Sequence, residues 1–284
     1  MTPRDGYLPG VPCWVDTGQP DPQAATEFYA ALFGWDFEDL MPAEVPGHYF
    51  IARLGGLDVA AIGSQQPGDD TPAAWTTYIA VADADESARA VTAAGGTVMV
   101  EPMDVMDAGR MAVVADPAGA TFSLWQAGRT KGAQLVNAPG TVNFNDFSTP
   151  DLDAAAAFYG AVFGWEVLRF PDDVGGGEMW ALRGYGDDLE RLEPGTRQRQ
   201  REMGAPDRFE DVVASVVPLD APEEQARWDV TFAVDDCDTI AARATELGGE
   251  VRVEPYDVGP VRTAQIADPA GARLTIGRFY PERL

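Results

Sequence analysis

This chain of 284 residues is poor in side chains that bind transition metals, with two cysteines and one histidine. Cys13 and Cys237 lie in different halves and show no spacing typical of a disulfide framework or a zinc site. No apolar run approaches the roughly 18 residues of a membrane span. The first residues also lack the charged and apolar regions of a signal peptide. We therefore expect a cytoplasmic protein that does not enter a membrane.

Positive charge is scarce as well. Lys and Arg number 20 against 46 Asp and Glu, which gives a formal net charge of -26. Binding nucleic acid through its phosphates needs clustered basic side chains, so this balance argues against a nucleic-acid partner. The acidic surface is compatible with a cationic ligand, although such charge mainly keeps a protein soluble.

What the sequence does contain is a tandem repeat. Residues 28–35, FYAALFGW, return as residues 158–165, FYGAVFGW, at an offset of 130. Later, residues 116–120, DPAGA, return as residues 268–272 at an offset of 152, so the second copy carries an insertion. A period of this length is too long for a solenoid and predicts a duplicated small domain. We place the first domain at 1–130 and the second at 131–284.

Each half reads as two strand-helix-strand-strand-strand units. In the first half, strands are predicted at 11–17, 49–54, 59–62, 76–82, 98–100, 112–115 and 121–125, and helices at 22–33 and 85–94. The first helix has Asp21 as its N-cap and Pro22 at the first helical position, and Gly34 ends it. Residues 126–140, which contain Gly128, Gly132, Pro139 and Gly140, are expected to form the linker.

The second copy departs from this pattern at about 184–227. Two or three short helices are expected there, the last capped by Asp207 with Phe209, Val212, Val213 and Val216 on one face. Helices inserted at this place would lie near the rim of the second domain's sheet. A lid over a ligand, a packing element and a dimer contact are the alternatives. Both a monomer and a homodimer remain open.

These motifs resemble the vicinal oxygen chelate superfamily of glyoxalases, bleomycin-resistance proteins and extradiol dioxygenases. The resemblance rests on Asp-x-x-x-Ala-x-x-Phe-Tyr-x-x-x-Phe-Gly-Trp, a strand running into Val-x-Asp, Gly-Gly after the second helix, and Asp-Pro-x-Gly, each present twice. The first half is especially similar to tandem actinobacterial glyoxalase-like proteins. The resemblance implies an α+β fold of four βαβββ units, paired into two domains whose curved mixed sheets each form a cup.

The resemblance also implies where metalloenzymes of this superfamily place their His, Glu or Gln ligands. Those positions hold Trp14, Thr76 and Ser123 in the first half, and Phe144, Asp229 and Thr275 in the second. Asp229 alone suits a divalent ion, whereas zinc or non-haem iron needs three or four protein ligands. We therefore expect no metal and no other cofactor, and neither metal-dependent glyoxalase nor dioxygenase chemistry.

If these positions point inward, strand alternation gives each cup an aromatic floor with a few polar groups, as in many ligand pockets. The same aromatic side chains could instead fill the cups as core. The residues expected to bind a ligand are Trp14, Tyr78, Trp125, Phe144, Thr231, Arg273, Arg110 and Arg262. Arg110 and Arg262 occupy matched places, where they would clamp an anion or form structural ion pairs.

Three cup carboxylates are candidate general acids or bases: Asp16, Asp146 and Asp229. Desolvation beside aromatic rings raises the pKa of a carboxyl group and suits it to proton transfer. Structural duties, such as accepting from a backbone amide or pairing with an arginine, are the alternative.

Two classes of function follow. We favour a metal-independent protein that binds a small molecule, sequestering or carrying a hydrophobic or cationic metabolite or antibiotic, as the resemblance to bleomycin-resistance proteins implies. The alternative is a cofactor-free isomerase, lyase or cyclase of specialised metabolism that uses the cup Asp residues. A glyoxalase-like detoxifying role is a third possibility, and the missing metal ligands speak against its known chemistry.

Overall fold

The computed structural model describes residues 3–65, 68, 71–170, 177–219 and 224–280. It confirms an α+β architecture in which each half contributes one eight-stranded mixed sheet. In the first half the strands are β1 (Pro12–Gln19), β2 (Asp36–Asp39), β3 (Tyr49–Leu54), β4 (Leu57–Ser64), β5 (Ala74–Ala80), β6 (Thr97–Val105), β7 (Gly109–Ala115) and β8 (Thr121–Ala127). In the second half they are β9 (Val142–Thr149), β10 (Glu166–Phe170), β11 (Gly177–Ala181), β12 (Val212–Pro218), β13 (Arg227–Ala233), β14 (Glu250–Val258), β15 (Val261–Ala267) and β16 (Arg273–Phe279).

The two sheets have the same topology. Their strand orders are β2-β3-β4-β1-β5-β8-β7-β6 and β10-β11-β12-β9-β13-β16-β15-β14. The central antiparallel pair, β1 with β5 or β9 with β13, joins two βαβββ units edge to edge. We number the units in chain order: unit 1 contains β1–β4, unit 2 β5–β8, unit 3 β9–β12 and unit 4 β13–β16.

One helix follows the first strand of each unit: α1 (Pro22–Phe33), α2 (Ala84–Ala93), α3 (Leu152–Phe163) and α6 (Cys237–Glu246). The caps of α1 are those that the sequence predicts. The Asp21 side chain accepts from the backbone N–H of Ala24 at 3.0 Å, and Gly34 ends the helix with a φ of 74°. No helix of the described residues is long and apolar enough to cross a membrane.

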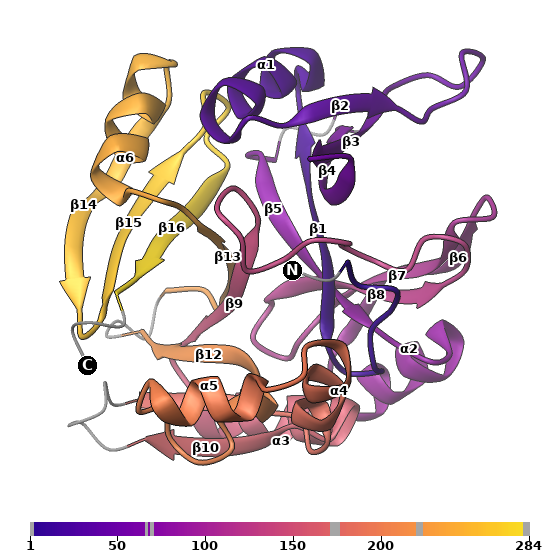
Figure 1. Ribbon diagram of the computed structural model, residues 1–284. Helices are drawn as coiled ribbons and strands as arrows, with labels where there is room; N and C mark the ends of the chain where they lie inside the picture. Colours follow the sequence, from indigo (N-terminus) through magenta and orange to yellow (C-terminus); the bar gives the residue numbers. More distant parts are fainter. Residues whose placement is uncertain (1–2, 66–67, 69–70, 171–176, 220–223, 281–284) are drawn as a thin grey trace.

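The helices pack between the sheets in an interleaved way. One core cluster joins unit 1 to unit 4, and α1 lies beside α6 (Figure 1). A second cluster joins unit 2 to unit 3, and α2 contacts α3. Each half therefore completes its two cores with side chains of the other half.

Buried hydrogen bonds explain two of the repeated motifs. The Tyr29 hydroxyl, from the Phe-Tyr motif of unit 1, donates to Asp268 Oδ2 at 3.0 Å, and Trp75 Nε1 donates to the Tyr29 oxygen at 3.0 Å. Asp268 belongs to the Asp-Pro-x-Gly turn of unit 4. The same relay recurs across the other pair of units, where Trp228 donates to Tyr159 at 2.9 Å and Tyr159 to Asp116 at 3.3 Å. The two motifs thus bind the halves together.

The insertion differs in part from the expectation. It contains α4 (Tyr185–Leu192), α5 (Thr196–Glu202) and a 3-10 turn, η2 (Phe209–Asp211). The predicted third helix is wrong, because Val212–Pro218 forms β12 and pairs in parallel with β9. Its run of β-branched side chains favours a strand, buried on both faces. The helical insertion at about 184–227 therefore ends at η2.

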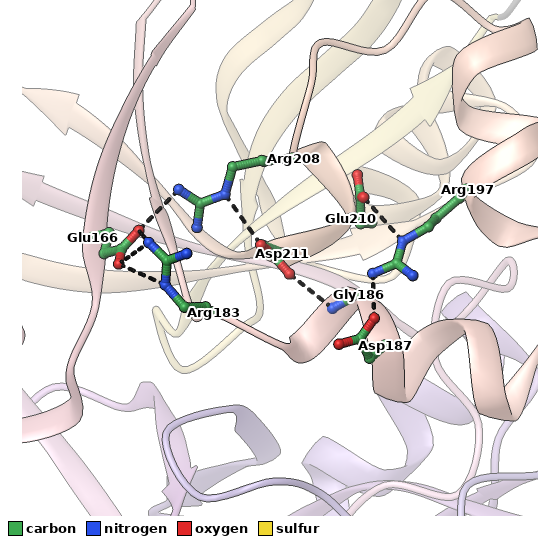
Figure 2. A network of polar contacts seen from close by, with 8 residues as sticks. All are labelled: Glu166, Arg183, Gly186, Asp187, Arg197, Arg208, Glu210 and Asp211. Atoms are coloured by element: carbon green, nitrogen blue, oxygen red, sulfur yellow. Dashed lines mark hydrogen bonds and ion pairs between the residues drawn. The ribbon is translucent and has the colours of Figure 1, made fainter.

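Ion pairs hold the insertion to the edge of the second sheet (Figure 2). Arg208 binds Glu166 of β10 at 2.8 Å and Asp211 at 3.2 Å, and Arg183 also binds Glu166, at 2.9 Å. Asp211 in turn accepts from the backbone N–H of Gly186 at 3.0 Å, which ties η2 to α4. Leu168, Met179, Ser215 and Asp146 are cross-strand partners in turn, and their side chains lie on the concave face of the sheet. Glu166 is two residues before Leu168 on the same strand, so its side chain points to the same face. The insertion is thus anchored on the cup side of β10.

Candidate functional site

The concave faces of the two sheets are the places where matched side chains of both halves converge; we call them cup 1 (first half) and cup 2 (second half). In cup 1, Trp14 is paired with Tyr78, and Tyr78 with Ser123, across neighbouring strands. In cup 2, the same row contains Phe144, Thr231 and Thr275. Strand alternation turns the intervening Val15 and Val230 toward the helices.

Cup 1 is built around Asp16. Both the Tyr78 and Tyr49 hydroxyls donate to Asp16 Oδ2, at 2.7 and 3.0 Å, and Trp14 Nε1 donates to the Tyr49 oxygen at 3.3 Å. Burial raises the pKa of Asp16 to about 6, while the hydrogen bonds from Tyr78 and Tyr49 oppose the rise. Burial likewise holds the pKa values of both tyrosines well above their usual range.

Aromatic side chains fill cup 1. Trp14, Tyr78 and Trp125 are only 8%, 7% and 7% exposed and form one cluster with Ile51 and Ala61. The linker closes over this cluster. Trp125 Nε1 donates to the carbonyl of Thr130 at 3.1 Å, and the Tyr7 hydroxyl donates to the carbonyl of Ala133 at 2.6 Å. In this half the aromatic side chains expected to bind a ligand form a packed core.

Cup 2 has smaller side chains at the matched places. Thr231 stands where cup 1 has Tyr78, and Gly277 stands where cup 1 has Trp125, since Ala80 pairs with Trp125 and Ala233 with Gly277. A Cβ atom at Gly277 would meet only ordinary contacts, the nearest being Thr231 Cγ2 at 3.5 Å. Phe144, Asp146 and Thr275 on the floor remain half-buried. Cup 2 therefore has less side-chain volume than cup 1 at these two matched places.

Asp146 is the counterpart of Asp16 on the floor of cup 2. It accepts from two aliphatic hydroxyls, those of Ser215 on β12 and Thr231 on β13. Burial raises the pKa of Asp146, its hydroxyl partners oppose this, and the charge of Asp229 adds to the rise. Asp229 is the register partner of Asp146 and pairs with Arg227 at 3.0 Å. Two carboxylates thus meet on this floor, one of them compensated by an arginine.

Arg110 and Arg262 lie outside the rows of cup residues and form ion pairs with helices, so ligand binding by these two arginines stays a prediction. Each stands on the helix-facing side of its strand, with Ala112 or Ala264 of the core. Arg110 makes a two-pronged ion pair with Asp85 of α2, and Arg262 does the same with Asp238 of α6. These contacts raise the pKa of both arginines. They tie each helix to its sheet, the structural alternative stated above.

The remaining predicted residue, Arg273, begins β16 and is exposed. It shares a face with Thr275 but lies at the end of the strand, against a groove between the halves. Sequence reasoning missed apolar side chains on the outer strands of both cups. Val100 and Met103 of β6 match Val253 and Tyr256 of β14, and all four are exposed. Exposed apolar side chains on a concave face are typical of a ligand-binding groove.

The side chains present do not fit a metal of the kind that this fold holds elsewhere. Among the described residues, no three His, Cys, Asp or Glu side chains come close enough to hold an ion. The places expected for ligands hold indole, hydroxyl and phenyl groups in addition to Asp229. His48 pairs with Asp39 at 2.6 Å and stacks on Phe50. A site for zinc or iron would need more nitrogen, sulfur or carboxylate ligands than either cup supplies.

Comparisons with known proteins agree with the fold. The model of the Glyoxalase/Bleomycin resistance protein/Dioxygenase superfamily matches residues 15–124 and 141–276. A Mycobacterium tuberculosis protein named "Putative glyoxylase CFP32" is 37% identical over 286 residues, all of both chains. The anthracycline biosynthesis protein DnrV of Streptomyces peucetius is 37% identical over 95% of this chain and 94% of its own.

Solved structures support the architecture alone, because their sequences are distant. The Mn(II)-bound glyoxalase from Novosphingobium aromaticivorans has a TM-score of 0.59 and 16% identity, covering 98% of this chain and 83% of that chain. The 2,3-dioxygenase LapB from Pseudomonas sp. KL28 has a TM-score of 0.58 and 13% identity, covering 96% and 94%.

Proposed function

This chain belongs to the glyoxalase, bleomycin resistance protein and dioxygenase superfamily, and we propose that it binds a hydrophobic small molecule in cup 2 without a metal. The main support for this proposal is that two aromatic side chains of cup 1 are replaced by smaller residues in cup 2. Where cup 1 is filled by Tyr78 and Trp125, cup 2 has Thr231 and Gly277. Small-molecule sites are concave and combine apolar surface with polar groups that fix orientation; in cup 2 the outer strands offer the apolar side chains and the floor offers the polar groups.

The walls and floor indicate the ligand's chemistry. Tyr256, Val258 and Phe279 offer exposed apolar surface on strands at one side of cup 2. Phe209 of the insertion contacts Phe170 of β10 at the other, with ring centroids 6.3 Å apart. The floor presents Asp146 and Asp229, which accept hydrogen bonds from hydroxyl or ammonium groups. A flat, largely apolar molecule that carries such donors suits this surface.

The names of the Streptomyces relatives give this proposal a first ligand class. DnrV and DauV are named as anthracycline biosynthesis proteins. Anthracyclines are flat polycyclic molecules with hydroxyl groups, the shape and polarity that cup 2 favours. The role we infer is sequestering or carrying such a molecule.

A cofactor-free enzyme is the second candidate, favoured by one observation. The carboxyl groups on both cup floors have pKa values raised by burial, as the carboxyl groups of general acid–base catalysts often do. Conversion of a bound ligand by the wild-type protein and not by Asp146→Asn, with binding retained in both, would support this role.

Fluorescence titration with the anthracycline daunorubicin tests the binding proposal. Gly277→Trp restores the ring that fills cup 1, and we expect it to weaken binding at least about tenfold through the loss of apolar contact. Gly6→Trp is the matched control, because a side chain at Gly6 meets nothing within 4 Å. Equal affinity of Gly277→Trp and the wild-type protein would place the ligand outside cup 2.

A further inference from the structure

A groove of about 640 Å³ lies between the two halves and shares Asp229 with the floor of cup 2. Its walls are the first residues of β5 and β13 together with the turns that lead into β8 and β16. These segments are counterparts in the repeat, so the groove lies where the two halves face each other. Trp75 stands in one wall and its counterpart Trp228 in the other.

The two walls differ in chemistry although they are related by the repeat. The first half contributes Ala73 and Ala74, and Thr121 at the start of β8. At the places matching Ala74 and Thr121, the second half has Arg227 and Arg273. One wall is therefore mainly apolar, and the opposite wall carries guanidinium groups.

The charges in the groove are unevenly satisfied. Arg227 is paired with Asp229 at 3.0 Å and also lies 3.7 Å from Glu224, so it compensates both acids of the groove. Arg273 is exposed, and its guanidinium makes no hydrogen bond or ion pair within the part of the chain that the structure describes. In a protein with 46 acidic and 20 basic side chains, most described arginines have a carboxylate partner. A guanidinium that lines a cavity without one is available to an anionic ligand.

We infer that this groove is a second binding site, which takes a small aromatic carboxylate. The carboxylate would accept two parallel hydrogen bonds from Arg273, the geometry that the guanidinium fork favours. The ring would lie against Ala74 and Trp75 on the opposite wall. This site goes beyond the proposed function in cup 2, because its ligand is anionic and its residues are not those of the cup floor, apart from Asp229 at the shared edge.

Calorimetric titration with 2-naphthoate and its neutral isostere 2-naphthamide tests the inference at 0.15 M salt. We expect the wild-type protein to prefer the carboxylate. Arg273→Gln should weaken 2-naphthoate binding at least about tenfold, the size of a hydrogen bond to a charged group, and leave 2-naphthamide unchanged. The affinity of Arg273→Lys for 2-naphthoate should lie between those of the wild-type protein and Arg273→Gln, because lysine keeps the positive charge but cannot donate two parallel hydrogen bonds.

Two controls separate this site from general electrostatics and from cup 2. Arg201→Gln removes the same charge from α5, outside the groove, and should leave 2-naphthoate binding unchanged. Gly277→Trp fills cup 2 and should also leave it unchanged. The inference is overturned if 2-naphthoate does not bind at millimolar concentration, if Arg201→Gln and Arg273→Gln act alike, or if Gly277→Trp removes binding.

Discussion

Cup 1 and cup 2 have the same topology and the same floor carboxylate, yet they differ in what surrounds it. Both carboxylates are half-buried, but Asp16 is held by two phenols beside the buried Trp14, whereas Asp146 is held by two aliphatic hydroxyls beside the half-buried Phe144. The difference arises mainly at two matched places, Tyr78 against Thr231 and Trp125 against Gly277. The two halves share one scaffold. Cup 1 is packed with aromatic side chains, whereas cup 2 has smaller side chains at the matched places.

The largest expected effect comes from making cup 1 resemble cup 2. Trp125→Gly removes a side chain that is 7% exposed, and we expect a loss of about 3–5 kcal/mol in the free energy of unfolding. Gly277→Trp, the reverse exchange in cup 2, adds a ring to a buried position where a Cβ meets only ordinary contacts, and we expect it to cost about 1–3 kcal/mol. Urea unfolding of both variants measures the difference. Similar losses would show that cup 2 is as tightly packed as cup 1.

The two Trp-Tyr-Asp relays should respond unequally to loss of the tyrosine hydroxyl. Tyr29→Phe leaves Asp268 with a second side-chain donor, Gln19 Nε2 at 2.7 Å. Thr149, the counterpart of Gln19, bonds instead to the backbone around Asp151. Both variants also leave a tryptophan N–H without its acceptor, so each should cost about 1–3 kcal/mol, with Tyr159→Phe the more costly.

Thermal and urea unfolding of Tyr29→Phe, Tyr159→Phe and the wild-type protein measure this difference. Phe28→Leu, which keeps an apolar side chain beside Tyr29, controls for general repacking of the core. If Tyr29→Phe proved the more costly, Gln19 would not be the compensating donor.

The smallest effect concerns pH. The pKa of Asp16 in the folded state is about 6 against an ordinary value of 3.8, so folding favours its protonated form. Stability from this group is fully present below pH 3.8 and is lost as the pH rises through 6. Between pH 5 and pH 8, the free energy of unfolding of Asp16→Asn should therefore rise by about 1 kcal/mol relative to the wild-type protein.

Asp146→Asn should show a change of the same direction, because burial also raises the pKa of Asp146. Urea titrations at several pH values give both curves. A wild-type protein that gained stability over Asp16→Asn as the pH rose would contradict the raised pKa.

Much of the fold could be predicted from the sequence because each helix, strand and turn motif occurs in both copies of the repeat. The helix α1 follows from Asp21, Pro22 and Gly34, each of which has a local role that its neighbours do not alter. The strand β12 was missed since Val212, Val213 and Val216 satisfy both a helical face and a strand buried on both sides. Its pairing with β9 decides the matter, and that contact is distant in the sequence.

The site was harder to predict than the fold. Strand alternation placed Trp14, Asp16 and Tyr78 on one face, but it could not tell a filled cup from an open one, which depends on the volume of side chains brought together from separate strands. It also placed no constraint on Arg110, whose partners come from α2 and β6. The informative signal was present in the alignment of the two halves, in which Gly277 of the second half is aligned with Trp125 of the first.

The interleaved cores have a consequence for the ancestry of this molecule. Since unit 1 packs on unit 4 and unit 2 on unit 3, neither half buries its helices without the other. We infer that a half-length ancestor would have met the same requirement by pairing with a second copy of itself, because the present chain has the arrangement of such a homodimer within one polypeptide. Within one polypeptide the two halves can differ in sequence, and here cup 1 has Tyr78 and Trp125 where cup 2 has Thr231 and Gly277.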